Sequence, residues 1–188
     1  MKSYKLLLFA SFWVGLSFQA FHLTSANSAL SQRPRPWDKV KVVPIGSTAP
    51  DWKLKTAVGD LVSLASLRGN VVVLDFWSNW CGPCRKMEPL LNRLVRTYKN
   101  KPVKIYTMSI WPDRDFNPQA YLKEHPMAAT FLLGTDEVAS DYGIWGVPTY
   151  YVITPQGKVA DIHVLLTVDA DALEKHLRDA IEQALPAK

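Results

Sequence analysis

The hydrophobic pattern of this chain changes period at one point, and that change predicts a strand followed by a helix. Val71–Trp77 is an almost unbroken apolar run rich in β-branched residues, which is typical of a strand buried on both faces. Further along, apolar side chains recur at helical spacing, at Met87, Leu90, Leu91, Leu94, Val95 and Tyr98. The pattern therefore predicts a buried strand that leads through a short turn into an amphipathic helix.

The remaining pattern predicts a single α/β domain. Before the buried strand, Gly46–Asn70 is predicted as a small hairpin, with strands at Trp52–Thr56 and Leu61–Leu64, that covers an edge or end of the main sheet. A second core strand at Val103–Ile110 completes a strand–helix–strand unit. The later predicted elements are helices at Asn117–His125, Asp136–Tyr142 and about Ala170–Leu185, and strands at Phe131–Leu133, Thr149–Thr154 and Val159–Leu165.

Residues 1–28 have the composition of an export segment. Lys2 and Lys5 precede the apolar run Leu6–Phe21, which has no charged residue, and a small polar stretch follows. The run is short for a spanning helix, which needs about 20 apolar residues. A cleaved signal peptide and a retained membrane anchor both remain open, and either places the rest of the chain outside the cytoplasm. We therefore expect a periplasmic protein, soluble or tethered to the inner membrane, with a proline-stiffened linker at residues 29–45 and one domain at residues 46–188.

Charge and composition argue against nucleic acid as a partner. The chain has 22 Lys and Arg against 17 Asp and Glu, a formal net charge of +5. Cleavage after the export segment would remove Lys2 and Lys5 but no acidic residue, which leaves +3. This excess is mild, and no basic run is interleaved with aromatic residues as nucleic-acid binding requires. We expect a monomer whose partners are proteins.

The turn between the predicted strand and helix holds both cysteines of the chain, in Trp80-Cys81-Gly82-Pro83-Cys84. This spacing allows a small disulfide ring that thiolate attack can reopen. Cys81 precedes the helix N-terminus, where free N–H groups and the positive end of the helix dipole lower the pKa of a thiol. Cys84, one turn into the helix, is expected to be more buried and less reactive.

Three uses of this cysteine pair are open from the residues alone. An oxidising compartment favours disulfides, yet the chain offers no second pair to staple its core, so a working redox couple is favoured. The alternatives are a structural disulfide and half of a zinc site. Zinc sites usually need four protein ligands, and a second Cys or His pair at ligand spacing is missing.

Three sequence motifs together resemble the thioredoxin fold: Asp75-Phe76-Trp77, the Trp80–Cys84 dithiol, and Gly146-Val147-Pro148-Thr149 in front of a β-rich run. The resemblance spans about Ala49–Leu185. It implies a mixed central sheet flanked by helices, with an N-terminal β-hairpin extension.

A second set of features is similar to the TlpA/ResA-type branch of exported thiol-disulfide oxidoreductases. These features are Ala49-Pro50-Asp51, Leu64–Asn70 before the buried strand, and the export segment. That branch more often places its Glu one position before Glu88, so the resemblance assigns no catalytic role to Glu88.

The resemblance implies that Cys81 is the nucleophile, which attacks a partner disulfide, and that Cys84 resolves the mixed disulfide. Asp75 is the only charged residue in its apolar strand. Burial would raise its pKa, which suits a group that exchanges a proton with Cys84 through water. The alternative is a carboxylate that is hydrogen-bonded at a strand end.

The expected substrate-binding residues surround the dithiol. Pro148 matches the cis-proline of the family, and Val147 would present its backbone to an extended stretch of the partner. Trp80, Gly82, Pro83 and Trp145 complete this set, although Trp145 and Trp111 could instead pack as loop plugs. We expect no metal and no cofactor other than the redox-active disulfide Cys81–Cys84.

The resemblance implies an enzyme that reduces disulfides of partner proteins, since Gly82-Pro83 is the pairing of thioredoxin-like reductants. Apocytochrome c and copper-site assembly factors are the suggested partners, with a membrane thiol reductant for recycling. Two other classes stay open, a Cu(I) binding or delivery module that uses both thiolates and a non-catalytic interaction scaffold. A thiol peroxidase is disfavoured, because no cysteine lies outside the dithiol.

Overall fold

The computed structural model describes residues 42–164 and 169–186. The predicted export segment at residues 1–28 lies outside the described residues, as do residues 29–41 of the predicted linker. Within the two described ranges, no helix has the length and apolar character needed to cross a membrane.

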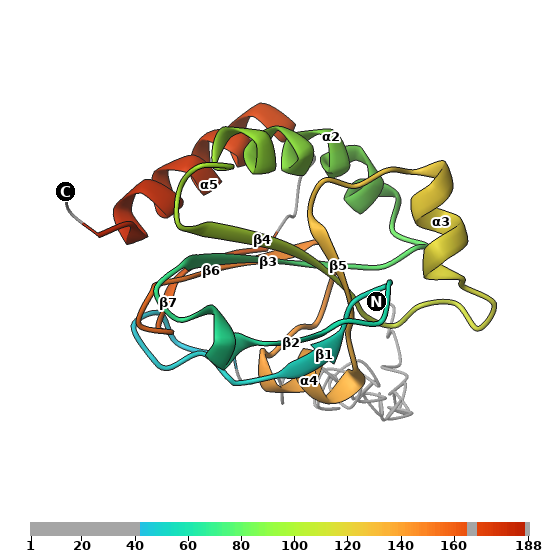
Figure 1. Cartoon of the computed structure of the whole chain (residues 1–188), viewed down its shortest axis with the longest axis horizontal. Coiled ribbons are helices and arrows are strands. Elements are labelled where there is room, and N and C mark those ends of the chain that lie inside the picture. Colours follow the sequence, from blue (N-terminus) through green and yellow to red (C-terminus); the bar gives the residue numbers. More distant parts are fainter. Residues whose placement is uncertain (1–41, 165–168, 187–188) are drawn as a thin grey trace, which may run out of the picture. The chain divides into compact units, whose positions relative to one another are not determined.

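Five strands form the central sheet in the order β5-β4-β3-β6-β7 (Figure 1). The middle strand, β3 (Val71–Trp77), runs parallel to β4 (Val103–Ser109) and antiparallel to β6 (Thr149–Ile153). The edges are β5 (Thr130–Leu133) and β7 (Val159–Val164). All seven residues of β3 are buried, which explains its continuous apolar sequence. The mixed sheet confirms the predicted fold class.

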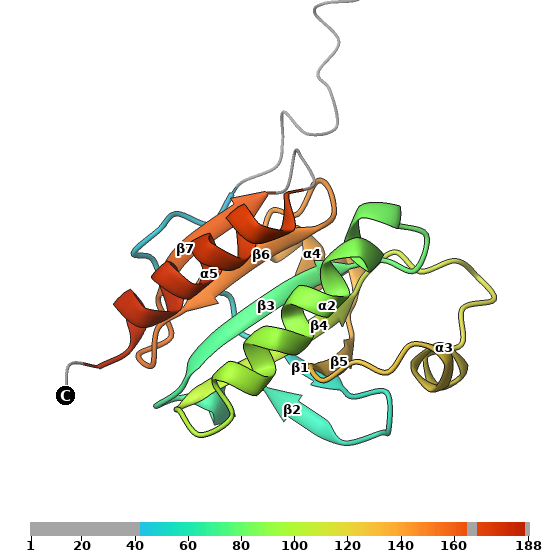
Figure 2. The ribbon, with the colours of Figure 1, turned by 90° about the horizontal axis from the view of Figure 1, so that it is seen from above.

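Two helices cover one face of this sheet, as Figure 2 shows from above: α2 (Gly82–Thr97) and α5 (Ala170–Ala184). Both bury the apolar stripe that their sequences predict. Glu174 of α5 joins the helices, since it pairs with Arg93 of α2 and with Arg178, each at 2.6 Å. The buried residues of this layer include Val71, Val73, Met87, Leu90, Leu91, Leu94, Ile105, Tyr150, Val152, Leu173, Leu177 and Ile181.

The opposite face carries the predicted N-terminal hairpin. Its strands β1 (Lys53–Lys55) and β2 (Leu61–Ser63) pair antiparallel, and the short 3₁₀ helix η2 (Leu64–Leu67) follows. The hairpin reaches the β5 edge through a bridge from Thr56 to Leu132, as predicted. It also covers the face of the sheet, together with α4 (Asp136–Asp141), and contributes Trp52, Leu54, Leu64 and Leu67 to the core there.

One further helix, α3 (Pro118–Glu124), lies beside the start of α2. Its N-cap residue Asn117 accepts a hydrogen bond from the N–H of Ala120 at 2.9 Å. Tyr121 of this helix packs against Trp77 at the end of β3, with ring centroids 5.1 Å apart. The helix therefore flanks the end of β3 from which the chain enters the dithiol turn.

Candidate active site

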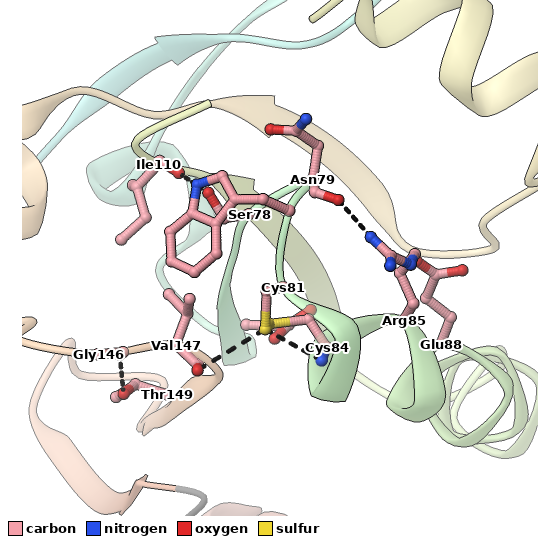
Figure 3. The surroundings of a disulfide bond; sticks show 12 residues. Ser78, Asn79, Cys81, Cys84, Arg85, Glu88, Ile110, Gly146, Val147 and Thr149 are labelled. Carbon is pink, nitrogen blue, oxygen red and sulfur yellow. Dashed lines mark hydrogen bonds between the residues drawn. A yellow bond between two sulfur atoms is a disulfide. The ribbon is translucent and has the colours of Figure 1, made fainter. Parts of the chain in front are cut away.

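The two cysteines form a disulfide at the start of α2 (Figure 3). Cys81 is the N-cap residue of this helix, and the backbone N–H of Cys84 donates a hydrogen bond to its Sγ at 3.1 Å. Pro83 lies in the first turn, where a missing N–H removes no helical hydrogen bond. The backbone N–H of Cys84 and the positive end of the helix dipole would stabilise a thiolate on Cys81 once the disulfide opens.

Both cysteines are largely covered by their surroundings. Cys84 is 1% exposed, and it is the more buried of the two, as predicted, but Cys81 is only 3% exposed. Trp77, Phe131 and Ala57 pack in the same cluster. A partner protein therefore meets the exposed residues around Cys81 before it reaches the sulfur.

The loop before β6 lies directly beside the dithiol. The Val147–Pro148 peptide bond is cis, as the resemblance implies, and Pro148 is buried. The Val147 carbonyl oxygen lies 3.7 Å from Cys81 Sγ (Figure 3). Thr149 Oγ1 donates to the Gly146 carbonyl at 2.8 Å, which ties the loop to the start of β6. This arrangement brings backbone groups of Val147 next to the predicted nucleophile.

Four tryptophans near the site divide into exposed and packed residues. Trp80 and Trp145 are each about half exposed, at 51% and 50%. Trp77 is fully buried, as predicted for a core residue. Trp111 is partly buried against the core, and its carbonyl accepts a hydrogen bond from Trp80 Nε1 at 2.8 Å. The loop-plug alternative therefore holds for Trp111, whereas Trp145 offers its indole to the surface.

The turn before the dithiol is held by side chains that the sequence did not single out. Ser78 is fully buried, and its hydroxyl donates to the Ile110 carbonyl at the end of β4. Asn79 Nδ2 donates to Asp113 Oδ2 at 2.8 Å, and the Asp113 N–H returns a bond to Asn79 Oδ1 at 3.0 Å. Arg85 of α2 donates to the Asn79 carbonyl (Figure 3). The sequence signal for this anchor is a serine directly after the largely apolar strand β3.

Asp75 lies on β3 beneath the first turns of α2. On the same face of this strand, Val73 packs in one cluster with Met87, and Trp77 packs in another with Cys84. Asp75 lies between Val73 and Trp77 along the strand, 1% exposed. It is paired with residues of both neighbouring strands, so it lies within the strand and not at its end.

The surroundings of Asp75 favour its protonated form. Burial raises the pKa of the carboxyl to about 8, the hydrogen bond from Thr107 opposes this shift, and the charge of Glu88 adds to it. Thr107 Oγ1 donates to Asp75 Oδ2 at 3.2 Å, whereas Asp75 Oδ1 has no hydrogen-bond partner among the described residues. A carboxyl group with this pKa can take up or release a proton near neutral pH.

Glu88 acts on this carboxyl through its charge. It lies one turn after Cys84 on α2 and accepts a hydrogen bond from Tyr121 of α3, 2.6 Å from hydroxyl to Oε1. Burial raises the pKa of Tyr121, and the hydrogen bond to Glu88 raises it further. Glu88 thus ties α2 to α3 and disfavours a negative charge on Asp75.

The histidines of the described domain make structural contacts. His125 stacks on Tyr121, with centroids 4.6 Å apart. His176 Nε2 lies 2.8 Å from Asp161 Oδ2, and its ring packs against His163. In residues 42–164 and 169–186, no group of three or more His, Cys, Asp or Glu side chains is placed to hold a metal ion.

The chain matches known proteins over the region that forms this site. A family model described as the AhpC/TSA family matches residues 45–162. The chain belongs to the AhpC/TSA family. The match includes the N-terminal hairpin, the dithiol and the cis-proline loop, so it covers all the predicted site residues.

Relatives of this AhpC/TSA chain are named as thiol-disulfide oxidoreductases or as thioredoxin-like proteins. The thiol-disulfide oxidoreductase ResA of Oceanobacillus iheyensis is 33% identical over 153 residues, which are 78% of this chain and 78% of that protein. The thioredoxin-like protein YneN of Bacillus subtilis is 31% identical over 120 residues, which are 63% of this chain and 71% of YneN.

Solved structures of thiol-disulfide proteins superimpose on this chain. A Chlorobium tepidum protein assigned as the thiol:disulfide interchange protein DsbE superimposes with a TM-score of 0.64 at 32% identity, over 74% of this chain and 99% of that one. The thioredoxin domain of a thiol-disulfide oxidoreductase from Bacteroides vulgatus also gives 0.64, at 26% identity and the same coverage. This AhpC/TSA chain is therefore a thioredoxin-like protein disulfide oxidoreductase, which confirms the predicted enzyme class.

Proposed function

We propose that this oxidoreductase is exported and reduces disulfides of partner proteins through Cys81 and Cys84. The observation that carries the proposal is the position of the Cys81–Cys84 disulfide, at the N-terminus of α2, beside the Val147–Pro148 loop and above Asp75. Each of these three neighbours serves a different step of thiol–disulfide exchange.

The first step is attack by Cys81. Its thiolate bonds to one sulfur of the partner disulfide, the partner disulfide breaks, and the other partner sulfur leaves as a thiolate. The N–H of Cys84, which donates to Cys81 Sγ, supports the thiolate before the attack.

The second step releases the partner. The Cys84 thiol gives its proton to the Asp75 carboxylate, and the resulting thiolate attacks Cys81 Sγ. The mixed disulfide breaks, the Cys81–Cys84 disulfide forms, and the second partner sulfur leaves as a thiolate that takes up a proton from solvent. Two electrons thus pass from the dithiol to the partner. A carboxyl with a pKa of about 8 is suited to this transfer near neutral pH.

The partner chain is proposed to bind in an extended form across Val147, between the exposed indoles of Trp80 and Trp145. Gly82 and Pro83 complete this surface. Half-exposed tryptophans beside a reactive sulfur supply contact area to a polypeptide. Trp145→Ala should raise KM for a peptide disulfide several-fold with little change in kcat. Steady-state kinetics test this, with Trp111→Phe as the control for loop packing, and an unchanged KM would remove Trp145 from the binding surface.

The sequence supports three further parts of the proposal: the direction of electron transfer, the partner proteins and the location in the cell. Gly82-Pro83 between the cysteines supports a reductant, and the resemblance of the sequence to the TlpA/ResA-type branch supports partners in cytochrome c maturation or copper-site assembly. A membrane thiol reductant would return the disulfide to the dithiol. The pattern of residues 1–28 supports a periplasmic location, with the segment cleaved or kept as an anchor.

Trapping the mixed disulfide tests the proposal directly. Full-length Cys84→Ala, expressed in the source cells, should accumulate adducts that dithiothreitol releases and that contain exported proteins with disulfides. The Cys81→Ala/Cys84→Ala double variant is the control and should trap nothing.

Three results would contradict the proposal and identify its rivals. Stoichiometric Cu(I) binding without disulfide reductase activity indicates a copper module, and full rescue of a deletion strain by Cys81→Ser indicates a non-catalytic scaffold. Adducts made only of cytosolic proteins would overturn the periplasmic location.

A further inference from the structure

Asp75 Oδ1 and the Tyr150 hydroxyl are two of the buried polar atoms that have no partner among the described residues, and they belong to neighbouring strands under α2. Asp75 of β3 is directly opposite Tyr150 of β6 in the strand register. Side chains directly opposite each other in an antiparallel pair project to the same face, with Cβ atoms about 4.5–5.5 Å apart. Tyr150 is 1% exposed, and among the described residues neither its hydroxyl nor Asp75 Oδ1 has a hydrogen-bond partner.

These two groups are complementary. A tyrosine hydroxyl can donate, and an ionised carboxylate can only accept. Leaving a buried polar group unsatisfied destabilises the folded state, so two such groups at one register position call for an explanation. The two groups also interact electrostatically, because the charge of Asp75, after burial, contributes to raising the pKa of Tyr150.

We propose that Tyr150 is a positioning residue for Asp75. When Cys84 gives up its proton, the Tyr150 hydroxyl donates a hydrogen bond to Oδ1 of the Asp75 carboxylate, directly or through one water molecule. This inference rests on the proposed function, in which Asp75 receives that proton. Tyr150 keeps its own proton throughout. One proton moves, from Cys84 Sγ to Asp75, and no bond to the tyrosine oxygen breaks.

Among the groups that face Asp75, Tyr150 is the unpaired donor directly opposite it in the strand register. From β4, Thr107 already occupies Oδ2. The Ser109 hydroxyl and Trp77 Nε1 are also buried without a partner among the described residues, but these two residues are opposite each other in the register and not opposite Asp75. From α2 come Cys84 and the negative charge of Glu88, which disfavours the carboxylate. The buried residues that α5 turns to this face are the apolar Leu173, Leu177 and Ile181.

A hydrogen bond to the charged form of an acid lowers its pKa. The Tyr150 hydroxyl would therefore lower the pKa of Asp75 towards neutral. It would oppose the upward shifts that burial and the charge of Glu88 cause. Without it the carboxylate would form only at higher pH, and fewer molecules would hold a competent base at neutral pH.

The test replaces Tyr150 by Phe in the full-length protein and measures two quantities. The titration of the Asp75 carboxyl is followed by ¹³C NMR, and release of a fluorescent peptide from the Cys81 mixed disulfide is followed by stopped flow across pH. Both midpoints should move upward together by about one pH unit, which slows release about tenfold below the midpoint. Unchanged midpoints in Tyr150→Phe would overturn the inference.

Two further measurements keep the test decisive. Tyr151→Phe is the matched control on the same strand, because its hydroxyl donates to the Tyr142 carbonyl on the opposite face, and it should leave both midpoints in place. If Tyr150→Phe does not fold, 3-fluorotyrosine at position 150 keeps the shape and strengthens the donor, so the Asp75 midpoint should fall. A midpoint that stays or rises would overturn the inference as well.

Failure of this inference can be told apart from failure of the proposed function. If Asp75→Asn releases the peptide at the wild-type rate, Asp75 is not the proton acceptor and the mechanism itself is wrong. If Asp75→Asn slows release but Tyr150→Phe moves neither midpoint, the mechanism stands and only the role of Tyr150 is refuted.

Discussion

The buried tyrosine hydroxyls on the two faces of the central sheet differ in their hydrogen bonding. On the face covered by the hairpin and α4, the Tyr142 hydroxyl donates to the Pro50 carbonyl at 2.7 Å, and the Tyr151 hydroxyl donates to the Tyr142 carbonyl. On the face covered by α2 and α5, the Tyr150 hydroxyl has no such partner among the described residues, and it lies opposite a carboxylate oxygen that has none either.

This difference distinguishes the face that supports the fold from the face that lies beneath the dithiol. Most buried polar groups in proteins are hydrogen-bonded, because an unpaired one is costly, and violations of that rule are expected mainly at functional sites. The two tyrosine hydroxyls on the hairpin face follow the rule and link the N-terminal segment to the end of α4 and to β6. The helix face departs from it beneath the dithiol, where burial raises the pKa of the Asp75 carboxyl to about 8.

Replacing Asp75 should produce the largest change in stability. The folded-state pKa of about 8 lies above the ordinary value of 3.8 for this side chain, so the folded protein binds this proton more tightly than the unfolded chain does. Stability should therefore fall as pH rises from about 4 to 8. Asp75→Asn removes this loss and should be more stable than wild type above about pH 8, by up to about 6 kcal/mol, and nearly equal to it near pH 4.

Urea unfolding of the disulfide form across this pH range measures the effect. Thr107→Val is the matched control, since it keeps the carboxyl and removes its hydrogen-bond donor, and its stability should still fall with pH. If the stability of Asp75→Asn falls with pH as that of wild type does, the Asp75 carboxyl is not the source of the pH dependence, and the proposed difference between the two faces is wrong.

A smaller effect is expected on the paired face. Tyr151→Phe removes the hydroxyl that serves the buried Tyr142 carbonyl, so it should cost about 1–2 kcal/mol of stability and leave the exchange rate unchanged. Tyr150→Phe removes a hydroxyl with no partner among the described residues and should cost less. Denaturant midpoints of the two variants compare the faces directly, and equal losses would contradict the distinction.

The smallest effect is expected at Glu88. Its charge raises the pKa of Asp75 but is the last of the three contributions, so Glu88→Gln should lower that pKa by a fraction of a unit. Tyr121→Phe, which removes the hydrogen bond to Glu88 but keeps the charge, should not lower it. NMR titration of Asp75 distinguishes the two variants, and an effect of equal sign and size in both would show that packing rather than charge is responsible.

Much of the fold could be predicted because it depends on local patterns. The apolar run of β3 and the helical stripes of α2 and α5 are properties of neighbouring residues, and these elements lie within a residue or two of their predicted bounds. The dithiol and Pro148 were found because their motifs are specific. The structure places the two motifs side by side although they are over sixty residues apart.

The residues that were missed depend on contacts between strands. Nothing next to Tyr150 in the sequence indicates that it lies opposite Asp75, because only the register of β3 with β6 brings them together. Thr107 and Ser78 are similar cases, since their partners, Asp75 and Ile110, are 32 residues away along the chain. The sequence offered only a weak signal for them, namely polar residues in or next to an otherwise apolar strand.

The central claim is that the proton of Cys84 passes to Asp75 when the partner is released. The most direct test mixes reduced protein with a fluorescent peptide disulfide and follows the second, peptide-releasing phase by stopped flow across pH. Wild type should release peptide with a rate that rises through a midpoint near 8. Asp75→Asn should lose this midpoint and be slower by a factor on the order of 10²–10⁴. Release from Asp75→Asn with the wild-type rate and midpoint would contradict the account.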